Sequence, residues 1–137
     1  MKRSTFLTIA ALSATLFGLG MLFMTEEFLG MWGFTLTTEK FLGVWGLTLS
    51  SGGIFLGQSV GALLLSLGVI NWIVRNAPDS VALDAILYGN LAVHLLTGTL
   101  DLFATTSGVI NVQGWGAVSL HVVLGVGFAY YLFVRKP

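Results

Sequence analysis

The sequence predicts an all-α membrane protein: a four-transmembrane-helix bundle with an interfacial tandem repeat between the first and second helices. Three observations predict it. Four apolar stretches have membrane-spanning length, the charged residues lie almost entirely between them, and the mean hydropathy is +0.91, with 55% hydrophobic and 9% charged residues. Such a chain cannot cover itself with polar surface in water, so we expect a lipid bilayer around it. Residues 1–137 are expected to form a single transmembrane domain, because four spans leave no room for a separate soluble domain.

Each apolar stretch is close to the ~20 residues that a helix needs to cross a hydrocarbon core. The stretches cover residues 6–24, 53–74, 81–103 and 115–134. Small residues recur every four positions in the first two stretches and therefore share one face of each helix. They are Ala10, Ala14 and Gly18 in the first stretch and Gly53, Gly57 and Gly61 in the second. Such faces let helix backbones approach closely in lipid, so we expect them to pack the first two helices together or to form an oligomer contact.

The distribution of basic residues predicts the orientation. Five of the six basic residues lie on one side of the expected bundle: Lys2, Arg3, Arg75, Arg135 and Lys136. Lys40 is the exception. By the positive-inside rule, both termini and the turn between the second and third spans are cytoplasmic.

The composition also excludes several classes of function. A formal net charge of zero makes nucleic acid an unsuitable partner. The absence of cysteine excludes disulfides, iron–sulfur clusters and thiolate nucleophiles. No spacing places a nucleophile beside a base, and no metal-binding motif is present. We therefore expect a protein that is not an enzyme.

Residues 25–50 hold a tandem duplication of 13 residues. TEEFLGMWGFTLT is followed by TEKFLGVWGLTLS, with nine identities. Each copy opens with Thr-Glu, which is typical of a helix start because the hydroxyl can cap a free amide, and each tail alternates threonine with leucine, which favours an extended backbone. We expect two interfacial helical turns anchored at headgroup level by Trp32 and Trp45. They either cap the bundle or offer a docking surface to a neighbouring subunit or a pigment-like ligand.

The third span carries a polar stripe. Asn90, His94, Thr97 and Asp101 follow spacings of four, three and four, which place them within an arc of about 60° on a helix. Polar groups in lipid must face protein or water. An aspartate at mid-helix costs roughly 2.5–3.5 kcal/mol to insert, so ionisable residues in a span indicate a functional site by default.

The two histidines of the chain are predicted to lie at similar depths. His94 is about 20 Å from the start of the third span, and His121 is about 9 Å from the opposite start of the fourth. Gly98 and Gly125 follow them by four residues and leave space beside each ring. Haem b or a chlorophyll-type macrocycle held by His94, His121 or both is therefore compatible with the pattern. Hydrogen bonding between helices explains the same residues without a cofactor.

Two short segments resemble a known family. Gly68-Val-Ile-Asn71-Trp72 with Arg75, and the run from Gly127 to Tyr131, are similar to those of uncharacterised DoxX-like four-helix bacterial membrane proteins. The resemblance covers residues 41–134 and implies a location in a bacterial inner membrane. It implies no catalytic mechanism.

Three functions remain open from the sequence. The favoured one is a non-enzymatic accessory or structural subunit that packs against other membrane proteins or against itself. The second is a cofactor-binding subunit for electron transfer, or a pigment-binding subunit, that uses His94 and His121. The third is a small proton or solute transport component that uses the polar stripe.

Overall fold

Four long helices make up most of the fold. The structure, a computed structural model, describes residues 1–31, 34–36, 47–49 and 51–135. The long helices are α1 (Arg3–Phe23), α3 (Ser51–Val74), α4 (Val81–Thr106) and α5 (Gly114–Ala129), the last continued by a π-helical turn, η1 (Tyr130–Val134). All four are long and apolar enough to cross a membrane, which confirms the predicted spans. Their ends differ from the predicted ends by at most three residues.

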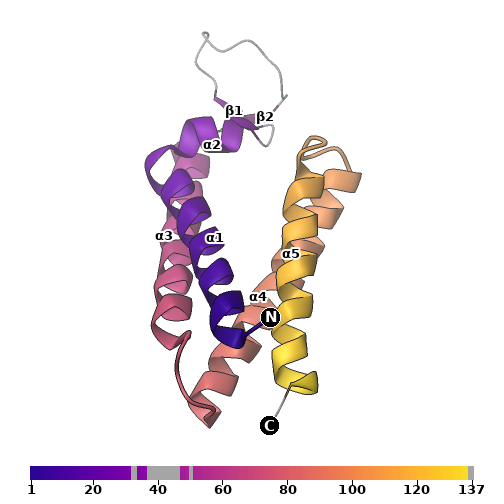
Figure 1. The fold of residues 1–137 in the computed structure, drawn as a ribbon. Helices are drawn as coiled ribbons and strands as arrows, with labels where there is room; N and C mark the ends of the chain where they lie inside the picture. Colours follow the sequence, from indigo (N-terminus) through magenta and orange to yellow (C-terminus); the bar gives the residue numbers. More distant parts are fainter. Residues whose placement is uncertain (32–33, 37–46, 50, 136–137) are drawn as a thin grey trace.

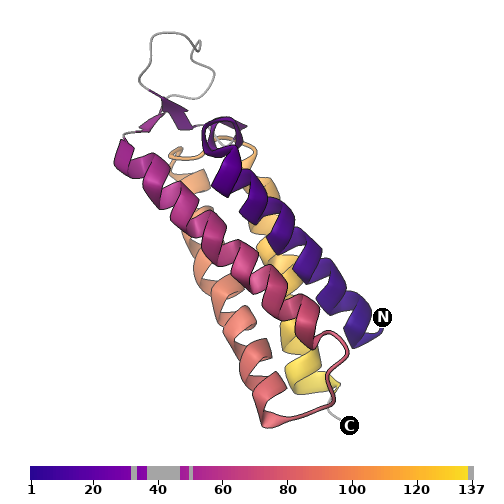
Figure 2. The same cartoon turned by 90° about the vertical axis from the view of Figure 1, so that its left-hand side faces the viewer.

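The helices pair as two antiparallel hairpins, shown side by side in Figure 1. We call α1 with α3 the first hairpin and α4 with α5 the second hairpin; the closest helix pairs are those within each hairpin. Both chain ends lie at one end of the bundle, the termini end, as Figure 2 also shows. The opposite end, the repeat end, carries the described residues between α1 and α3 and the turn between α4 and α5.

Glycines set the close packing of the first hairpin. A Cβ added at Gly18 would lie 2.6 Å from the backbone nitrogen of Leu65, and one at Gly61 would lie 2.7 Å from that of Leu22. A Cβ added at Gly68 would lie 3.0 Å from the carbonyl oxygen of Ala11. The two backbones therefore touch along the helices, a contact that larger side chains would prevent.

The other small residues predicted to pack helices together make none of these three close backbone contacts. Gly57 is buried, but its closest neighbours are side chains of the segment after α1. Ala10 is buried on the side of α1 that meets the second hairpin. Ala14 and Gly53 are half-buried.

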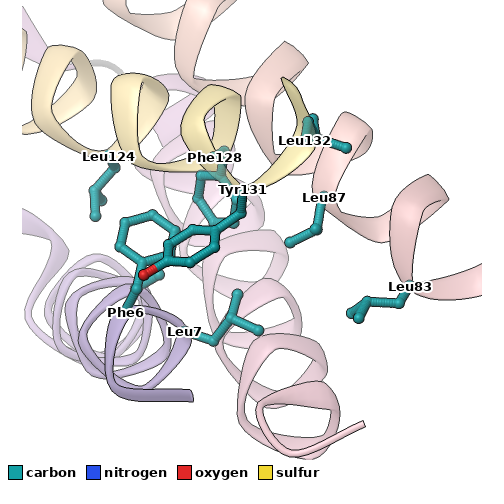
Figure 3. Packing of buried hydrophobic residues seen from close by; sticks show 9 residues of the cluster. Phe6, Leu7, Leu83, Leu87, Leu124, Phe128, Tyr131 and Leu132 are labelled. Atoms are coloured by element: carbon teal, nitrogen blue, oxygen red, sulfur yellow. The ribbon is translucent and has the colours of Figure 1, made fainter. Parts of the chain in front are cut away.

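The core that joins the hairpins lies near the termini end. Phe6 of α1 packs edge-on against Phe128 of α5, with ring centroids 4.8 Å apart, and also lies beside Tyr131. Figure 3 shows these rings together with leucines from α1, α4 and α5. The buried cluster consists of Phe6, Leu7, Ala10, Leu83, Leu87, Leu124, Phe128, Tyr131 and Leu132.

Polar contacts tie the chain ends together at the termini end. Arg3 pairs with Asp79 in the α3–α4 turn and donates to the carbonyl oxygen of Ala77, at 2.6 Å. The Tyr131 hydroxyl and the Arg135 guanidinium both donate to the carbonyl oxygen of Met1, at 2.9 and 2.7 Å. The basic side chains that the structure describes thus gather at this end of the bundle.

At the repeat end, the first repeat copy begins as helix α2 (Thr25–Met31). Thr25 does not act as the predicted N-cap: its hydroxyl donates to the carbonyl oxygen of Met21, at 2.6 Å. Threonine hydroxyls within the helices make the same bond to the carbonyl four residues back, as Thr8 does to Ser4. The predicted anchors Trp32 and Trp45 lie outside the described residues.

The tails of the two repeat copies pair with each other. Strands β1 (Phe34–Leu36) and β2 (Leu47–Leu49) are parallel, and Phe34, Thr35 and Leu36 face Leu47, Thr48 and Leu49. Each residue therefore faces its equivalent 13 positions later. The pairing register equals the repeat length.

Candidate functional site

The second hairpin brings the two histidines into direct contact. Nδ1 of His94 in α4 lies 2.9 Å from Nδ1 of His121 in α5. A hydrogen bond between two such nitrogens requires that one carry the proton and the other accept it. The ring of His94 also stacks on Phe128, with centroids 5.5 Å apart. The imidazole of His94 is therefore held on one edge and one face.

Asp101 and Thr97 extend this contact toward the repeat end. Nε2 of His121 lies 3.4 Å from Oδ2 of Asp101, and Nδ1 lies 3.2 Å from Oγ1 of Thr97. The Thr97 hydroxyl also donates to the carbonyl oxygen of Val93. We call Asp101, His121 and His94 the relay. Its members are in contact from near the repeat end of α4 to the middle of the helix.

The second hairpin owes this geometry to its local sequence. Ser80 caps α4 by accepting from the backbone nitrogen of Leu83, at 3.2 Å. The turn to α5 uses Gly108 at φ 75°, a conformation suited to glycine. Asn111 stabilises the turn by accepting from the backbone nitrogen of Gln113, at 2.7 Å. Because α4 and α5 run antiparallel, His94 and His121 lie at the same level of the hairpin.

Two glycines make room for the histidines. A Cβ added at Gly98 would lie 2.9 Å from Cβ of His121, and one at Gly125 would lie 3.6 Å from Cβ of His94. Each histidine thus packs against the glycine that follows the other histidine by four residues. The opposite histidine takes up part of the space that the sequence pattern offered to a flat macrocycle.

One macrocycle held by both histidines does not fit this arrangement. Metal–imidazole bonds are about 2 Å long, so two nitrogens on opposite sides of one metal stand about 4 Å apart. The Nδ1 atoms are 2.9 Å apart and bond to each other. Within the described residues, no group of three or more histidine, cysteine, aspartate or glutamate side chains could hold a metal ion.

Asn90 belongs to a different contact from the rest of the predicted stripe. Its side-chain amide pairs reciprocally with that of Asn71 in α3, at 2.8 and 3.1 Å, and also donates to the carbonyl oxygen of Ile86. Both asparagines are 1% exposed. This amide pair joins the two hairpins, whereas the relay lies within the second hairpin.

Spacing along the chain does not identify Asn71 as the partner of Asn90. A single amide in an apolar span has no spacing pattern that identifies its partner. The stripe on α4 is therefore divided by the direction of each side chain: Asn90 faces α3, while His94, Thr97 and Asp101 lie toward α5.

A groove runs along the surface of the second hairpin at the level of the histidines. Its volume is about 440 Å³. Both histidines and glycines described above line it, together with apolar side chains of α4 and α5. Several of these side chains are largely exposed, among them Leu95 and Val126, at 60% and 65%. In a bilayer, this groove faces hydrocarbon.

Comparison with protein-family models, curated proteins and solved structures gave no match for this chain. The DoxX-like resemblance therefore stays a prediction. The relay and the groove beside it are the features on which a function can be argued.

Proposed function

We propose that this protein is a non-enzymatic proton-transfer component of a membrane. The second hairpin carries protons between the water at the repeat end and the middle of the bilayer, through Asp101, His121 and His94. The observation that carries the proposal is the continuous contact of these three ionisable side chains inside a membrane-spanning hairpin. Chains of aspartate and histidine in membrane spans are the usual components of proton relays.

The chemical groups of the relay suit proton transfer. A carboxylate can take up a proton from water, and imidazole can accept a proton at one nitrogen while it releases another from the second. His121 has Asp101 at Nε2 and His94 at Nδ1, so its ring links the two.

A purely structural role explains the relay less well. The first hairpin packs through glycines without ionisable side chains at its contact, which shows that this chain can join two helices cheaply. Ionisable groups are costly in lipid. Their concentration at the contact of the second hairpin supports a chemical role. Packing beside another membrane protein, favoured from the sequence, stays a further prediction.

The relay ends in the middle of the membrane. One turn beyond His94, toward the termini end, lies the amide pair of Asn71 and Asn90. Amides do not titrate, so this pair interrupts the path of ionisable groups. If the termini end is cytoplasmic, as the basic residues predict, the relay opens toward the outside. We expect vesicles that contain the protein alone to hold a pH gradient as long as protein-free vesicles do.

Proton exchange between water and the imidazole groups tests the relay directly. Nitrogen-15 NMR on the protein in lipid bilayers measures how fast the His94 ring proton exchanges with water. We expect Asp101→Asn to slow this exchange at least about tenfold, because the amide keeps the shape but cannot accept a proton. Ser66→Ala is the matched control, since this hydroxyl on α3 donates only to its own helix, at the carbonyl oxygen of Ala62. Equal exchange rates in wild type and Asp101→Asn would refute the relay.

A further inference from the structure

We propose that the groove of the second hairpin is a binding site for a lipid-soluble weak acid whose hydroxyl group hydrogen-bonds to His94. Binding of this ligand depends on the geometry of the groove alone. The claim that this ligand exchanges a proton with the relay rests on the proposed function.

The groove is open to the surface of the hairpin and has room for a small molecule. A volume of about 440 Å³ falls within the range of roughly 300–1,000 Å³ that is typical of ligand pockets. Such sites combine apolar walls with a few placed polar groups. The lining residues are Leu91, His94, Leu95, Gly98, Thr99, Leu102, Val118, His121, Val122, Gly125, Val126 and Ala129.

His94 is the polar group left for a ligand. Its side chain is nine-tenths buried, at 9% exposure, and it lines the groove. Nδ1 is engaged by His121 and the ring face by Phe128. Among the described residues, its Nε2 has no hydrogen-bond partner. This nitrogen is not among the fully enclosed atoms that lack a partner, so it reaches the surface of the groove. Hydrocarbon offers it no hydrogen bond there, and a ligand with a hydroxyl group does.

The other polar groups of the lining are already occupied. The Thr99 hydroxyl donates to the carbonyl oxygen of Leu95, at 2.7 Å. His121 faces Asp101 and His94 with its two ring nitrogens. The ligand therefore needs a single hydrogen-bonding group, placed at His94, and an apolar remainder.

The position of the groove indicates that the ligand reaches it from the hydrocarbon of the bilayer. Its rim is formed by exposed apolar side chains such as Val122, at 58%, which in a bilayer contact hydrocarbon. A permanently charged molecule would pay a large desolvation cost to reach this depth. A hydrophobic molecule with a neutral hydroxyl group does not, and a phenol is the simplest molecule of this class.

A proton passes between the ligand and Asp101 through the side chains of the relay alone. The ligand O–H bond breaks and the proton bonds to Nε2 of His94, while the Nδ1 proton of His94 passes to Nδ1 of His121. The Nε2 proton of His121 then passes to the Asp101 carboxylate. The ligand is left as its anion and Asp101 is left protonated; the reverse sequence carries a proton from Asp101 to the ligand oxygen. No electron is transferred.

Binding of 4-dodecylphenol to the protein in lipid nanodiscs tests the site, with dodecylbenzene as the ligand that lacks the hydroxyl. The readout is the nitrogen-15 shift of His94 Nε2 during titration of each compound. We expect the phenol to bind about fivefold more tightly than dodecylbenzene or better, as one hydrogen bond in a dry site provides. His94→Phe, followed by competition binding, should remove this preference.

Two matched variants locate the site. Val122→Trp places a large ring in the groove and should abolish binding of the phenol. Val123→Trp adds the same ring at the next position of α5, which is also exposed but does not line the groove, and should bind as wild type does. Equal binding of the two compounds to wild type, or unchanged phenol binding in Val122→Trp, would overturn the proposal.

Failure of the binding site and failure of the relay give different experimental results. Asp101→Asn should still bind the phenol, because Asp101 does not line the groove. If the phenol binds but proton exchange of His94 is insensitive to Asp101→Asn, the site stands and the proposed function fails. If proton exchange depends on Asp101 but the phenol does not bind, the site fails and the relay stands.

Discussion

The two hairpins solve the problem of helix association in lipid in different ways. In the first hairpin, glycines bring backbone against backbone, as at Gly18 and Gly61. In the second, Gly98 and Gly125 each make room for a histidine of the opposite helix. The same residue type therefore serves close packing in one hairpin and the placement of polar side chains in the other.

This difference indicates that the two hairpins contribute different properties to the protein. The first hairpin gains stability from dense apolar packing and shows no ionisable side chain at its glycine contact. The second contains the intramembrane ionisable residues and a groove beside them. The amide pair of Asn71 and Asn90 and the aromatic core at the termini end hold the two together. Substitutions in the first hairpin should affect stability, and substitutions in the second should mainly affect proton exchange.

The largest expected effect on stability comes from Gly61→Leu. A Cβ at this position meets backbone atoms of α1 at 2.7–2.9 Å, which cannot move without separating the helices. We expect a loss of about 3 kcal/mol or more in unfolding free energy in detergent, the upper range for overpacking. Gly57→Leu should cost less, because its nearest neighbours are the movable side chains of Thr25 and Leu29.

Gly89→Leu is the control for this comparison, since a Cβ there meets nothing within 4 Å. Its unfolding free energy should remain close to that of wild type. Equal losses for Gly61→Leu and Gly89→Leu would show that the first hairpin does not depend on backbone contact.

An intermediate effect is expected from the amide pair between the hairpins. Asn71→Leu leaves the Asn90 side chain partly unsatisfied in a buried site and should cost about 1–2 kcal/mol. The double variant Asn71→Leu, Asn90→Leu removes both polar groups and should cost no more than the worse single variant. Additive losses in this double-mutant cycle would contradict the pairing.

The smallest effect is expected at the termini end. Asp79→Asn removes the charge that faces Arg3, but Asp79 is more than half exposed and Arg3 keeps its bond to the carbonyl oxygen of Ala77. Exposed ion pairs contribute about 0.2–1 kcal/mol. We expect a loss within that range that disappears at high salt. A loss above about 2 kcal/mol would show that this ion pair holds the two hairpins together.

The fold was largely predictable because length and hydropathy decide it. Four apolar stretches of about twenty residues have few alternatives in a membrane, and the described spans follow them closely. The Thr25 cap was predicted wrongly because a threonine hydroxyl can also donate to the carbonyl four residues back, and the sequence pattern does not decide between the two bonds.

The site was predictable only in part. The distances of His94 and His121 from the starts of their spans placed both residues at one level. The spacing on α4 grouped His94 with Asp101. The partner of Asn90 and the groove depend on how each helix is rotated about its axis, which spacing within one helix does not determine. The role of Gly98 and Gly125 was likewise hidden, because a glycine pattern shows that space exists and not what fills it.

The relay depends most on the bond between the two histidines, and a through-hydrogen-bond nitrogen-15 correlation measures this bond directly. The chain contains two histidines, so His121→Asn assigns both signals. For the protein in lipid bilayers, we predict a cross-peak between Nδ1 of His94 and Nδ1 of His121 that is lost in His121→Asn. Two histidine signals without a cross-peak, with an Nδ1–Nδ1 separation above about 4 Å, would contradict both the relay and the division between the hairpins.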